Sequence, residues 1–196
     1  MDAAVLRGMA KWPNVPAVYG WLSLDGRGSW FIKGDRVTNP TLSAFISRNY
    51  ESDGAGRWFF QNGPQRVFVA IQYTPFVYRV TNEAKSPLAI ESHTGLAVGA
   101  LSGAWIDENG ALLIETEHGI GTIDDRDLDK MLAALVDANG ASAPEAVLDE
   151  VTQLMQQGEA APLWLQFGGA RVKVDPITSA AVPSRFGFDA EPAADE

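Results

Sequence analysis

The chain has 196 residues, 46% of them hydrophobic and six of them tryptophan, which is enough apolar material for one large domain or two small lobes. It contains no cysteine, which excludes disulfides, a thiolate nucleophile and a cysteine-ligated metal site. The net charge is −10, no run of about 18 apolar residues predicts a membrane span, and the first residues have no signal-peptide pattern, so a cytoplasmic protein is expected.

The first half is predicted to contain two helices and three hairpins. Residues 2–11 have the apolar spacing of a short amphipathic helix, and the two prolines in residues 12–16 predict a rigid, extended arm. Asn39 followed by Pro40 is typical of a helix start. The hairpin strands are predicted over 21–24 and 30–32, over 57–61 and 66–73, and over 76–81 and 88–92.

The second half follows the same order with one addition. A hairpin is predicted across residues 107–110, and apolar spacing predicts a helix over 125–136. A capping-box pattern at Ser142 and Glu145 predicts an extra helix that continues to residue 155. Strands are predicted over 163–167 and 171–174, and residues 189–196 are expected to form a disordered acidic tail.

Two stretches of the chain repeat. Residues 58–69 and 163–174 match in register at Gln61/Gln166, Gly63/Gly168, Arg66/Arg171, Val67/Val172 and Val69/Val174. Upstream, residues 20–28 resemble residues 104–110. The repeat predicts an α+β protein of two related lobes, each hairpin–helix–hairpin with an antiparallel sheet. The expected parts are an N-terminal helix and Pro-rich arm (1–18), a first lobe (19–96), a second lobe with the extra helix (97–188) and the tail (189–196).

Charge is distributed unequally between the halves. Residues 1–96 hold ten Lys/Arg and seven Asp/Glu, a balance of +3, whereas residues 97–196 hold five and eighteen, a balance of −13. The acidic half is explained by solubility alone. The alternatives are that the lobes attract each other or that the first half binds an anion. No basic stripe is present, so nucleic acid is not an expected partner.

Part of the first half resembles a known family. The block KWPNVPAVYGWL at 11–22, with RNY at 48–50 and RWFFQNGPQRV at 57–67, resembles an uncharacterised family of short proteobacterial proteins. Residues 20–95 and 163–174 are more distantly similar to a second bacterial family of unknown function. The second resemblance implies a two-lobed α+β fold with repeated motifs, for which a signalling role is suggested. Neither resemblance implies catalytic residues.

Motifs for catalysis or cofactors are weak. The two histidines, His93 and His118, are expected at a strand end and in a turn, and no serine lies in a nucleophile elbow. The acidic run at 125–129 superficially resembles a calcium loop, but Lys130 and Val136 occupy positions where such a loop needs Gly and Glu. The glycines at 119–121 and 25–28 are interpreted as turns, because neither forms a phosphate-binding motif. No metal and no cofactor are predicted.

Aromatic residues and arginines in the first half form the candidate binding site. Most of the aromatics are expected in the core, while the remainder could line a groove for a planar or anionic ligand or a peptide. The candidate ligand-binding residues are Arg57, Trp58, Gln61, Arg66, Gln72 and Arg79. Arg66 and Arg171, at equivalent repeat positions, can also be structural, each bonding carbonyls of its own hairpin.

The sequence favours a non-catalytic module that binds a small molecule or a protein, and a role in regulation or signalling is suggested. The site is expected in the cleft between the lobes or on the hairpin face that carries Arg66. One alternative is a small enzyme that uses Asp, Glu and Arg in the interlobe cleft. Another is a structural subunit of an oligomer. Catalytic residues and the oligomeric state stay open, and no membrane partner is expected.

Overall fold

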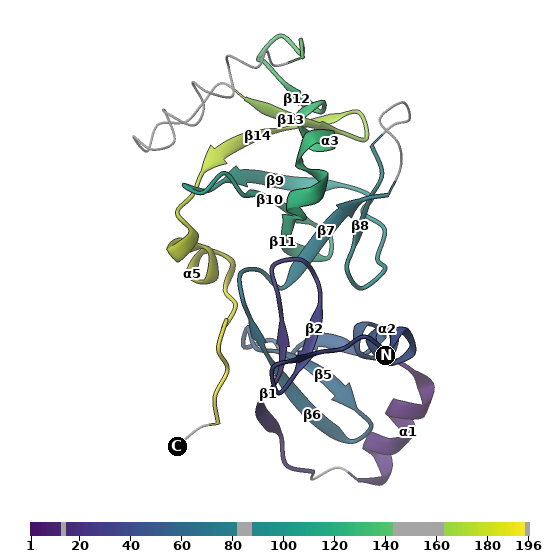
Figure 1. Ribbon diagram of the computed structural model, residues 1–196. Helices are drawn as coiled ribbons and strands as arrows, with labels where there is room; N and C mark the ends of the chain where they lie inside the picture. The colour runs from purple at the N-terminus through teal and green to yellow at the C-terminus, as the bar shows by residue number, and fades with distance from the viewer. Residues whose placement is uncertain (13–14, 82–87, 143–162, 195–196) are drawn as a thin grey trace. The chain divides into compact units, whose positions relative to one another are not determined.

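Helix starts and tight turns occur where the sequence carries their residues. Asn39 caps helix α2 (Pro40–Arg48) because its Oδ1 accepts hydrogen bonds from the amides of Thr41, at 2.9 Å, and Leu42, at 3.2 Å. Helix α1 (Ala3–Lys11) buries Val5, as its spacing predicts. The computed structural model describes residues 1–12, 15–81, 88–142 and 163–194 (Figure 1).

The fold is a mixed α+β fold with two sheets and few helices. The first sheet has the order β3 (Asp35–Arg36), β2 (Trp30–Ile32), β1 (Val18–Leu24), β6 (Gln65–Ile71), β5 (Trp58–Asn62) and β4 (Tyr50–Ser52). The second has the order β12 (Leu135–Val136), β13 (Trp164–Phe167), β14 (Ala170–Pro176), β9 (Leu101–Ile106), β10 (Leu112–Thr116), β11 (Gly119–Ile123), β7 (Phe76–Val80) and β8 (Ile90–Ser92). Every hairpin predicted in the first half is present.

Both sheets are mixed, which corrects the expectation of antiparallel sheets. The hairpins themselves are antiparallel, but β1 pairs in parallel with β6, and β14 pairs in parallel with β9. A third parallel pair joins β11 to β7. The central pair of strands comes from two separate hairpins, so nothing in the local pattern of either hairpin indicates its direction relative to the other.

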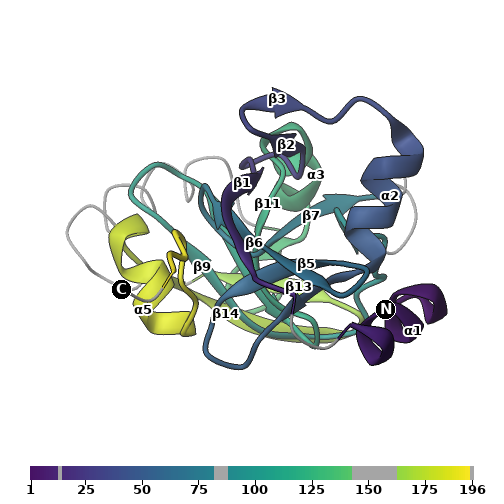
Figure 2. The same ribbon diagram turned by 90° about the horizontal axis from the view of Figure 1, so that it is seen from below.

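The chain divides into two compact units. One contains Met1–Pro75 and Pro183–Glu196, and the other contains Phe76–Val182. The expected boundary at residue 96 differs from this division, because the hairpin of β7 and β8 extends the second sheet through β11. Within the first unit, α2 packs against β5 (Figure 2).

Each unit has its own buried core. The largest fully buried apolar side chains of the first are Leu24, Trp30, Ile46 and Val69, and those of the second are Tyr78, Leu113, Ile114, Met131, Leu135, Leu163 and Leu165. Most of these side chains lie on sheet strands, and the consecutive buried residues Leu113 and Ile114 show that β10 is covered on both faces.

The segment predicted as one helix over 125–136 is instead three short elements. A 3-10 turn, η1 (Asp125–Asp127), leads into α3 (Leu128–Leu132), and β12 then pairs with β13. Asp124 starts the turn by accepting from the amide of Arg126, at 3.0 Å. Sheet pairing at Leu135 and Val136 outweighs the helical spacing of the segment. A further short helix, α5 (Val182–Phe186), follows the 3-10 turn η2 (Ser179–Ala181).

The expectation of a disordered acidic tail is wrong for its first residues. The amide of Asp189 donates to the carbonyl of Gly56, at 2.9 Å, and the amide of Ile71 donates to the carbonyl of Ala190, at 2.8 Å. Backbone pairing with the first unit therefore orders a segment whose composition alone suggests a free tail.

Four turns share one hydrogen-bond pattern. In each, an Asp accepts through Oδ1 from the amides two and four residues later, and a glycine three residues later has φ between 77° and 86°. The Asp/Gly pairs are Asp25/Gly28, Asp53/Gly56, Asp107/Gly110 and Asp137/Gly140. Only glycine takes this left-handed conformation without strain, which explains the turn glycines of the sequence.

Most of the additional residues of the second half lie at one place. Matching residues are 84 positions apart at Asp53/Asp137 and 105 apart at Gln61/Gln166, so 21 residues are added before the second of these pairs. The predicted extra helix at 142–155 falls in this stretch and, apart from Ser142, lies outside the described residues.

Candidate functional site

The hairpin of β5 and β6 brings two of the predicted site residues together. Gln61 and Arg66 are direct cross-strand partners, so their side chains leave the same face of the sheet. The amide of Gln61 also donates to the carbonyl of Asn49, at 2.8 Å, which ties this end of β5 to the end of α2. Gln61 and Arg66, which both match residues of the later stretch 163–174, are thus neighbours on adjacent strands.

Gln61 has an unsatisfied acceptor. The residue is only 1% exposed, and its Nε2 donates to the carbonyl of Gly63, at 2.9 Å. Its Oε1 is buried and accepts no hydrogen bond from any described residue. Leaving a buried polar atom without a partner costs about 1–3 kcal/mol, so such atoms mark sites that a ligand or water completes.

A pocket of about 360 Å³ lies against this pair. It is lined by Met9, Trp12, Val15, Ala17, Gln61, Pro64 and Arg66. Helix α1 lies beside the hairpin, and Gly8 faces the turn at Gly63 and Pro64. The pocket volume falls at the lower end of the range for small-molecule sites.

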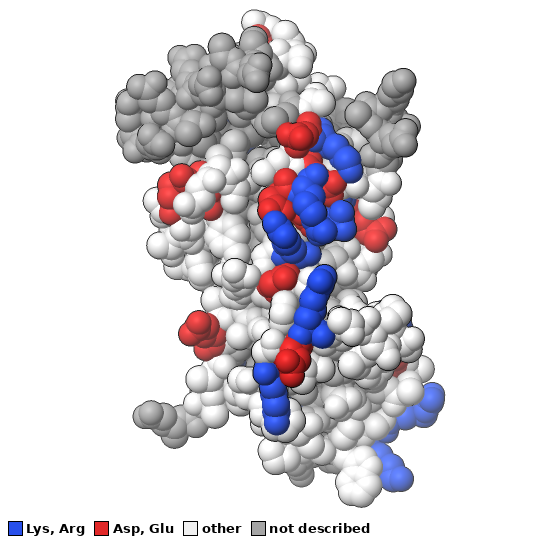
Figure 3. Space-filling view, viewed as in Figure 1, with Lys and Arg blue, Asp and Glu red and all other residues white. Residues whose placement is uncertain are grey.

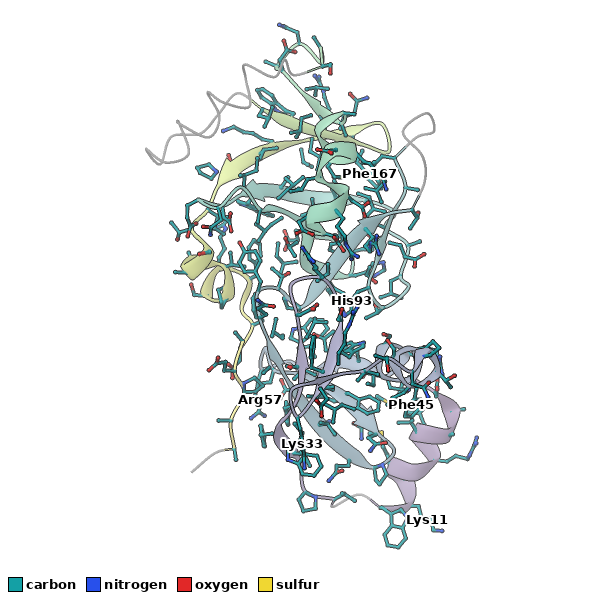
Figure 4. All side chains as sticks on the ribbon, in the orientation of Figure 1. Lys11, Lys33, Phe45, Arg57, His93 and Phe167 are labelled. Carbon is teal, nitrogen blue, oxygen red and sulfur yellow. The ribbon has the colours of Figure 1, made fainter. Side chains whose placement is uncertain are left out.

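The rim of the pocket is basic and aromatic. The Arg66 guanidinium lies 4.7 Å from the centre of the buried Phe59 ring and forms no ion pair with any described carboxylate. Trp12 is 58% exposed, and the Lys11 ammonium lies 5.7 Å from the centre of its ring. Lys11 is labelled at the end of α1 in Figure 4. None of the described lining residues is acidic, so an anion meets no repulsion there.

An aromatic layer supports the arginine side of the pocket. The Phe59 and Phe68 rings lie edge to face at 5.9 Å between centres, and Tyr19 stacks on Phe68 at 4.6 Å. Such ring pairs hold fixed geometries, so Arg66 rests on a rigid surface rather than on a mobile loop.

Arg57 has a structural role in the same face. Its Nε donates to Oδ2 of Asp53, at 2.8 Å, and its guanidinium lies 5.0 Å from the centre of the Phe68 ring. Burial raises the pKa of Asp53, but hydrogen bonds from Arg57 and from the amides of Ala55 and Arg57 outweigh burial and lower that pKa. The carboxylate therefore stays charged, and Arg57 stays attached to it.

The other three predicted residues lie apart from the pocket. Trp58 packs on Tyr50, with ring centres 4.9 Å apart. Gln72 closes a turn, because its Oε1 accepts from the amide of Gly26 at 2.9 Å. Arg79 belongs to β7 of the second unit and donates to Oδ2 of Asp127, at 3.4 Å. Arg79 belongs to the second sheet, whereas Trp58 is three positions from Gln61 on β5 and so its side chain leaves the opposite face of that strand.

Met9, Trp12 and the end of the arm are lining residues that the sequence did not indicate as a site. Residue 12 was assigned to the rigid arm, and its exposed indole is the one feature that departs from a simple linker. The sequence feature that could have indicated this lining residue is a tryptophan next to a proline in a rigid segment.

The equivalent pair in the second sheet is organised differently. Gln166 and Arg171 are cross-strand partners in the same register, but Gln166 is exposed. Arg171 donates to the carbonyl of Ala138, at 3.4 Å, as expected of a structural arginine. Within the described residues, the buried environment of Gln61 therefore has no equivalent at Gln166.

An ion cluster in the second unit contains the acidic run of the sequence. Asp124 and Asp127 are buried, and Arg79, Arg126 and Lys130 pair with them. Figure 3 shows basic and acidic side chains intermixed on this face. Hydrogen bonding from Arg126 lowers the pKa of Asp124 to about 2. The carboxylates are occupied by cationic side chains, and within the described ranges no group of three His, Asp or Glu is placed to hold a metal.

Both histidines contact backbone groups. His93 follows β8, and its Nδ1 accepts from the amide of Val77 at 3.2 Å. Burial lowers the pKa of His93 to about 3, so the ring is neutral at pH 7. His118 lies in the tight turn before β11 and contacts the carbonyl of Ala97 at 2.8 Å. Gly119 and Gly121, interpreted as turn residues, belong to β11, where a Cβ on Gly121 would collide with the Tyr78 ring.

The fold and the pocket thus define a mixed α+β protein with a small basic and aromatic cavity on its first sheet. No described helix is long and apolar enough to cross a membrane. A family model named DUF2944, described as "Protein of unknown function (DUF2946)", matches residues 1–193, and the chain belongs to this family. The resemblance to an uncharacterised family is confirmed.

Two crystal structures match the chain. A DUF1285 family protein from Silicibacter pomeroyi DSS-3 is 16% identical, with a TM-score of 0.53 over 84% of this chain and 85% of that one. A DUF1285 family protein from Shewanella baltica OS155 is 13% identical, with a TM-score of 0.38 over 56% of this chain and 91% of that one. The first similarity shows the fold alone. No curated protein matches the sequence significantly.

Proposed function

We propose that this protein is a non-catalytic module that binds a small molecule in the pocket beside Gln61 and Arg66. The observation that carries the proposal is the buried Oε1 of Gln61, which has no hydrogen-bond donor among the described residues of a pocket of about 360 Å³. A bound ligand that donates to this oxygen would remove the cost of the unmade hydrogen bond. Binding without chemistry suits a regulatory or signalling role.

The carboxylates give the alternative of an enzyme no support. A general acid at neutral pH needs a carboxyl whose pKa is raised by burial or by a second acid. Among the described residues, every carboxylate with a resolved shift has a lowered pKa, namely Asp2, Asp53, Glu108, Glu117, Asp124, Asp127 and Asp137.

We also propose that the two sheets are diverged copies of one scaffold. The order β3-β2-β1-β6-β5-β4 corresponds strand by strand to β11-β10-β9-β14-β13-β12, with the same parallel pair at the centre. The shared register of Gln61/Arg66 and Gln166/Arg171 and the four Asp-Gly turns support this proposal. Among the described residues, α1 and the arm precede only the first copy, and the pocket lies there.

A thermal-shift screen of metabolites tests the binding proposal. A ligand at one hundred times its Kd stabilises the protein by about 2.7 kcal/mol, which is readily measured. Native mass spectrometry of the purified protein gives the stoichiometry, expected to be one ligand per chain. We expect Arg66→Ala to reduce the stabilisation strongly.

The second copy supplies the matched control. Arg171→Ala removes an arginine at the equivalent register position and is expected to leave ligand binding unchanged. Equal stabilisation of wild type, Arg66→Ala and Gln61→Met by every ligand found would overturn the proposed site.

A further inference from the structure

The pocket restricts the chemistry of its ligand, and this inference rests on the proposed function. We propose that the ligand is a planar heterocyclic anion that carries an N–H donor, of the kind found in nucleoside monophosphates and in indole carboxylates. Three features of the described lining carry the proposal: an acceptor without a donor, a guanidinium without an acid, and an exposed aromatic face.

The first feature requires a donor on the ligand. The side-chain amide of Gln61 has one acceptor and two N–H donors, and its Nε2 is already held by the carbonyl of Gly63. This bond fixes the direction of the amide and leaves Oε1 as the group without a partner. A ligand that offers only acceptors at this point would leave Oε1 unsatisfied and would gain nothing from it.

The second feature favours a negative charge on the ligand. Arg66 is exposed, carries a fork of N–H donors suited to carboxylate or phosphate, and forms no ion pair in the described part of the chain. Lys11 adds a second positive charge near Trp12. A cationic ligand would meet repulsion from both groups without an acidic residue to offset it.

The third feature favours a flat ring. The indole of Trp12 is more than half exposed, although tryptophan is a residue that proteins usually bury. Aromatic faces and guanidinium planes are the surfaces on which planar rings stack. The remaining walls, Met9, Val15, Ala17 and Pro64, are apolar and adapt to a ring rather than to a hydrated polar chain.

Two other features of the described residues give weaker support for a ligand site. The ion cluster around Asp124 and Asp127 is internally neutralised by Arg126 and Lys130. A second pocket, of about 190 Å³, is lined by Trp21, Leu42 and Phe45 among others and is apolar, but nothing in the described residues defines what fills it.

Paired ligands test the inference by isothermal titration calorimetry. Indole-3-acetate is compared with benzothiophene-3-acetate, and adenosine 5′-monophosphate with purine riboside 5′-monophosphate; the second member of each pair lacks the donor. In at least one pair, we expect the donor-bearing member to bind roughly tenfold more tightly or better, because the donor completes a buried acceptor. The pair that shows this difference distinguishes a carboxylate source from a phosphate source.

Variants of the pocket residues test whether the affinity difference within a ligand pair arises in this pocket. Gln61→Met is expected to abolish the preference within the pair, and Arg66→Ala to weaken both members by roughly tenfold. Gln166→Met in the second sheet is the matched control and is expected to keep both affinities. A circular dichroism melt of each variant separates loss of binding from loss of folding, and Gln61→Leu repeats the test if Gln61→Met unfolds.

Equal binding of the two members of each pair, or no binding of any of the four at millimolar concentration, overturns the inference. The proposed function fails separately, because it depends on the metabolite screen and on the loss of stabilisation in Arg66→Ala. A cationic or non-planar ligand that still depends on Arg66 would sustain the function and contradict the inference.

Discussion

Arg57 and Arg66 lie at opposite ends of the hairpin of β5 and β6 and differ in what holds them. Arg57 is bound to Asp53, whose side chain is 4% exposed, whereas Arg66 rests on the Phe59 ring and pairs with no carboxylate of the described residues. The sequence predicted both arginines for the site on equal terms. The difference arises from the burial of Asp53, which holds Arg57 in a structural role and leaves Arg66 available to a ligand. That burial depends on tertiary packing.

Replacement of each arginine by alanine is expected to separate the two roles. Arg57→Ala should lower the free energy of unfolding by about 1–3 kcal/mol, because it removes a charged hydrogen bond from a buried carboxylate. Arg66→Ala should cost about 1 kcal/mol or less, the value of an exposed cation–π contact. Urea denaturation at pH 7 measures both, and equal costs would contradict the assignment.

Asp124 makes the stability of the second unit sensitive to acid. Arg126 lowers the pKa of Asp124 in the folded state to about 2, below the value near 4 in an unfolded chain. A lowered folded-state pKa gives stability that is present above pH 4 and is lost as the pH falls toward 2. Wild type should therefore lose on the order of 1–2 kcal/mol more than Asp124→Asn between pH 4 and pH 2.

The measurement is thermal or urea unfolding at several pH values in this window. Asp35→Asn, on the exposed edge strand β3, is the control for the removal of one negative charge. Parallel acid profiles of wild type and Asp124→Asn would show that the ion pair adds no stability.

At the scale of elements, local pattern predicted the hairpins and α2 well, because turn glycines and a cap residue act within a few residues. The local pattern gave the wrong structure where pairing between strands that are distant in sequence determines the secondary structure. Leu135 and Val136 have helical spacing with their neighbours, yet they pair with β13. The glycines of β11 are required by the Tyr78 ring of β7, a contact that no local pattern contains.

The turn at Gly54 and Gly56 tests how the C-terminal segment is attached. Both glycines have positive φ, but a Cβ on Gly56 would collide with the carbonyl of Gly187, whereas one on Gly54 meets nothing within 4 Å. Gly56→Ala is therefore expected to cost about 1–3 kcal/mol more than Gly54→Ala, since backbone strain is common to both. Chemical denaturation compares them, and equal costs would mean that the segment moves aside freely.

At the scale of the whole molecule, the sequence repeat predicts two related lobes, which stays a proposal, and it gives no sign of a division of the chain after Pro75. The match at Gln61/Gln166 gives corresponding strands, and both hairpins appear in the same register. The hairpin of β7 and β8 has no counterpart in the repeat, so nothing in the sequence indicated that it belongs to the second sheet. The pocket could not be predicted either, because it forms only when α1 packs beside the hairpin, and that packing is a tertiary contact.

Deletion of residues 189–196 is expected to loosen the first unit alone. It removes the hydrogen bonds of Gly56 and Ile71 to the segment, each worth about 0.5–1.5 kcal/mol. Amide hydrogen exchange by NMR should show faster exchange at Ile71 and unchanged protection at Leu113 in β10. Equal loss of protection at both amides would show that the two units open together.

The first unit is formed from two separated stretches of chain, and this has a consequence for synthesis. A ribosome adds residues in order, and domains generally fold as they emerge. All of Phe76–Val182 has been translated before Asp189 and Ala190 exist to meet Gly56 and Ile71. The nascent chain therefore holds everything the second unit needs while the first still lacks its last segment, so the half that is made first is completed last.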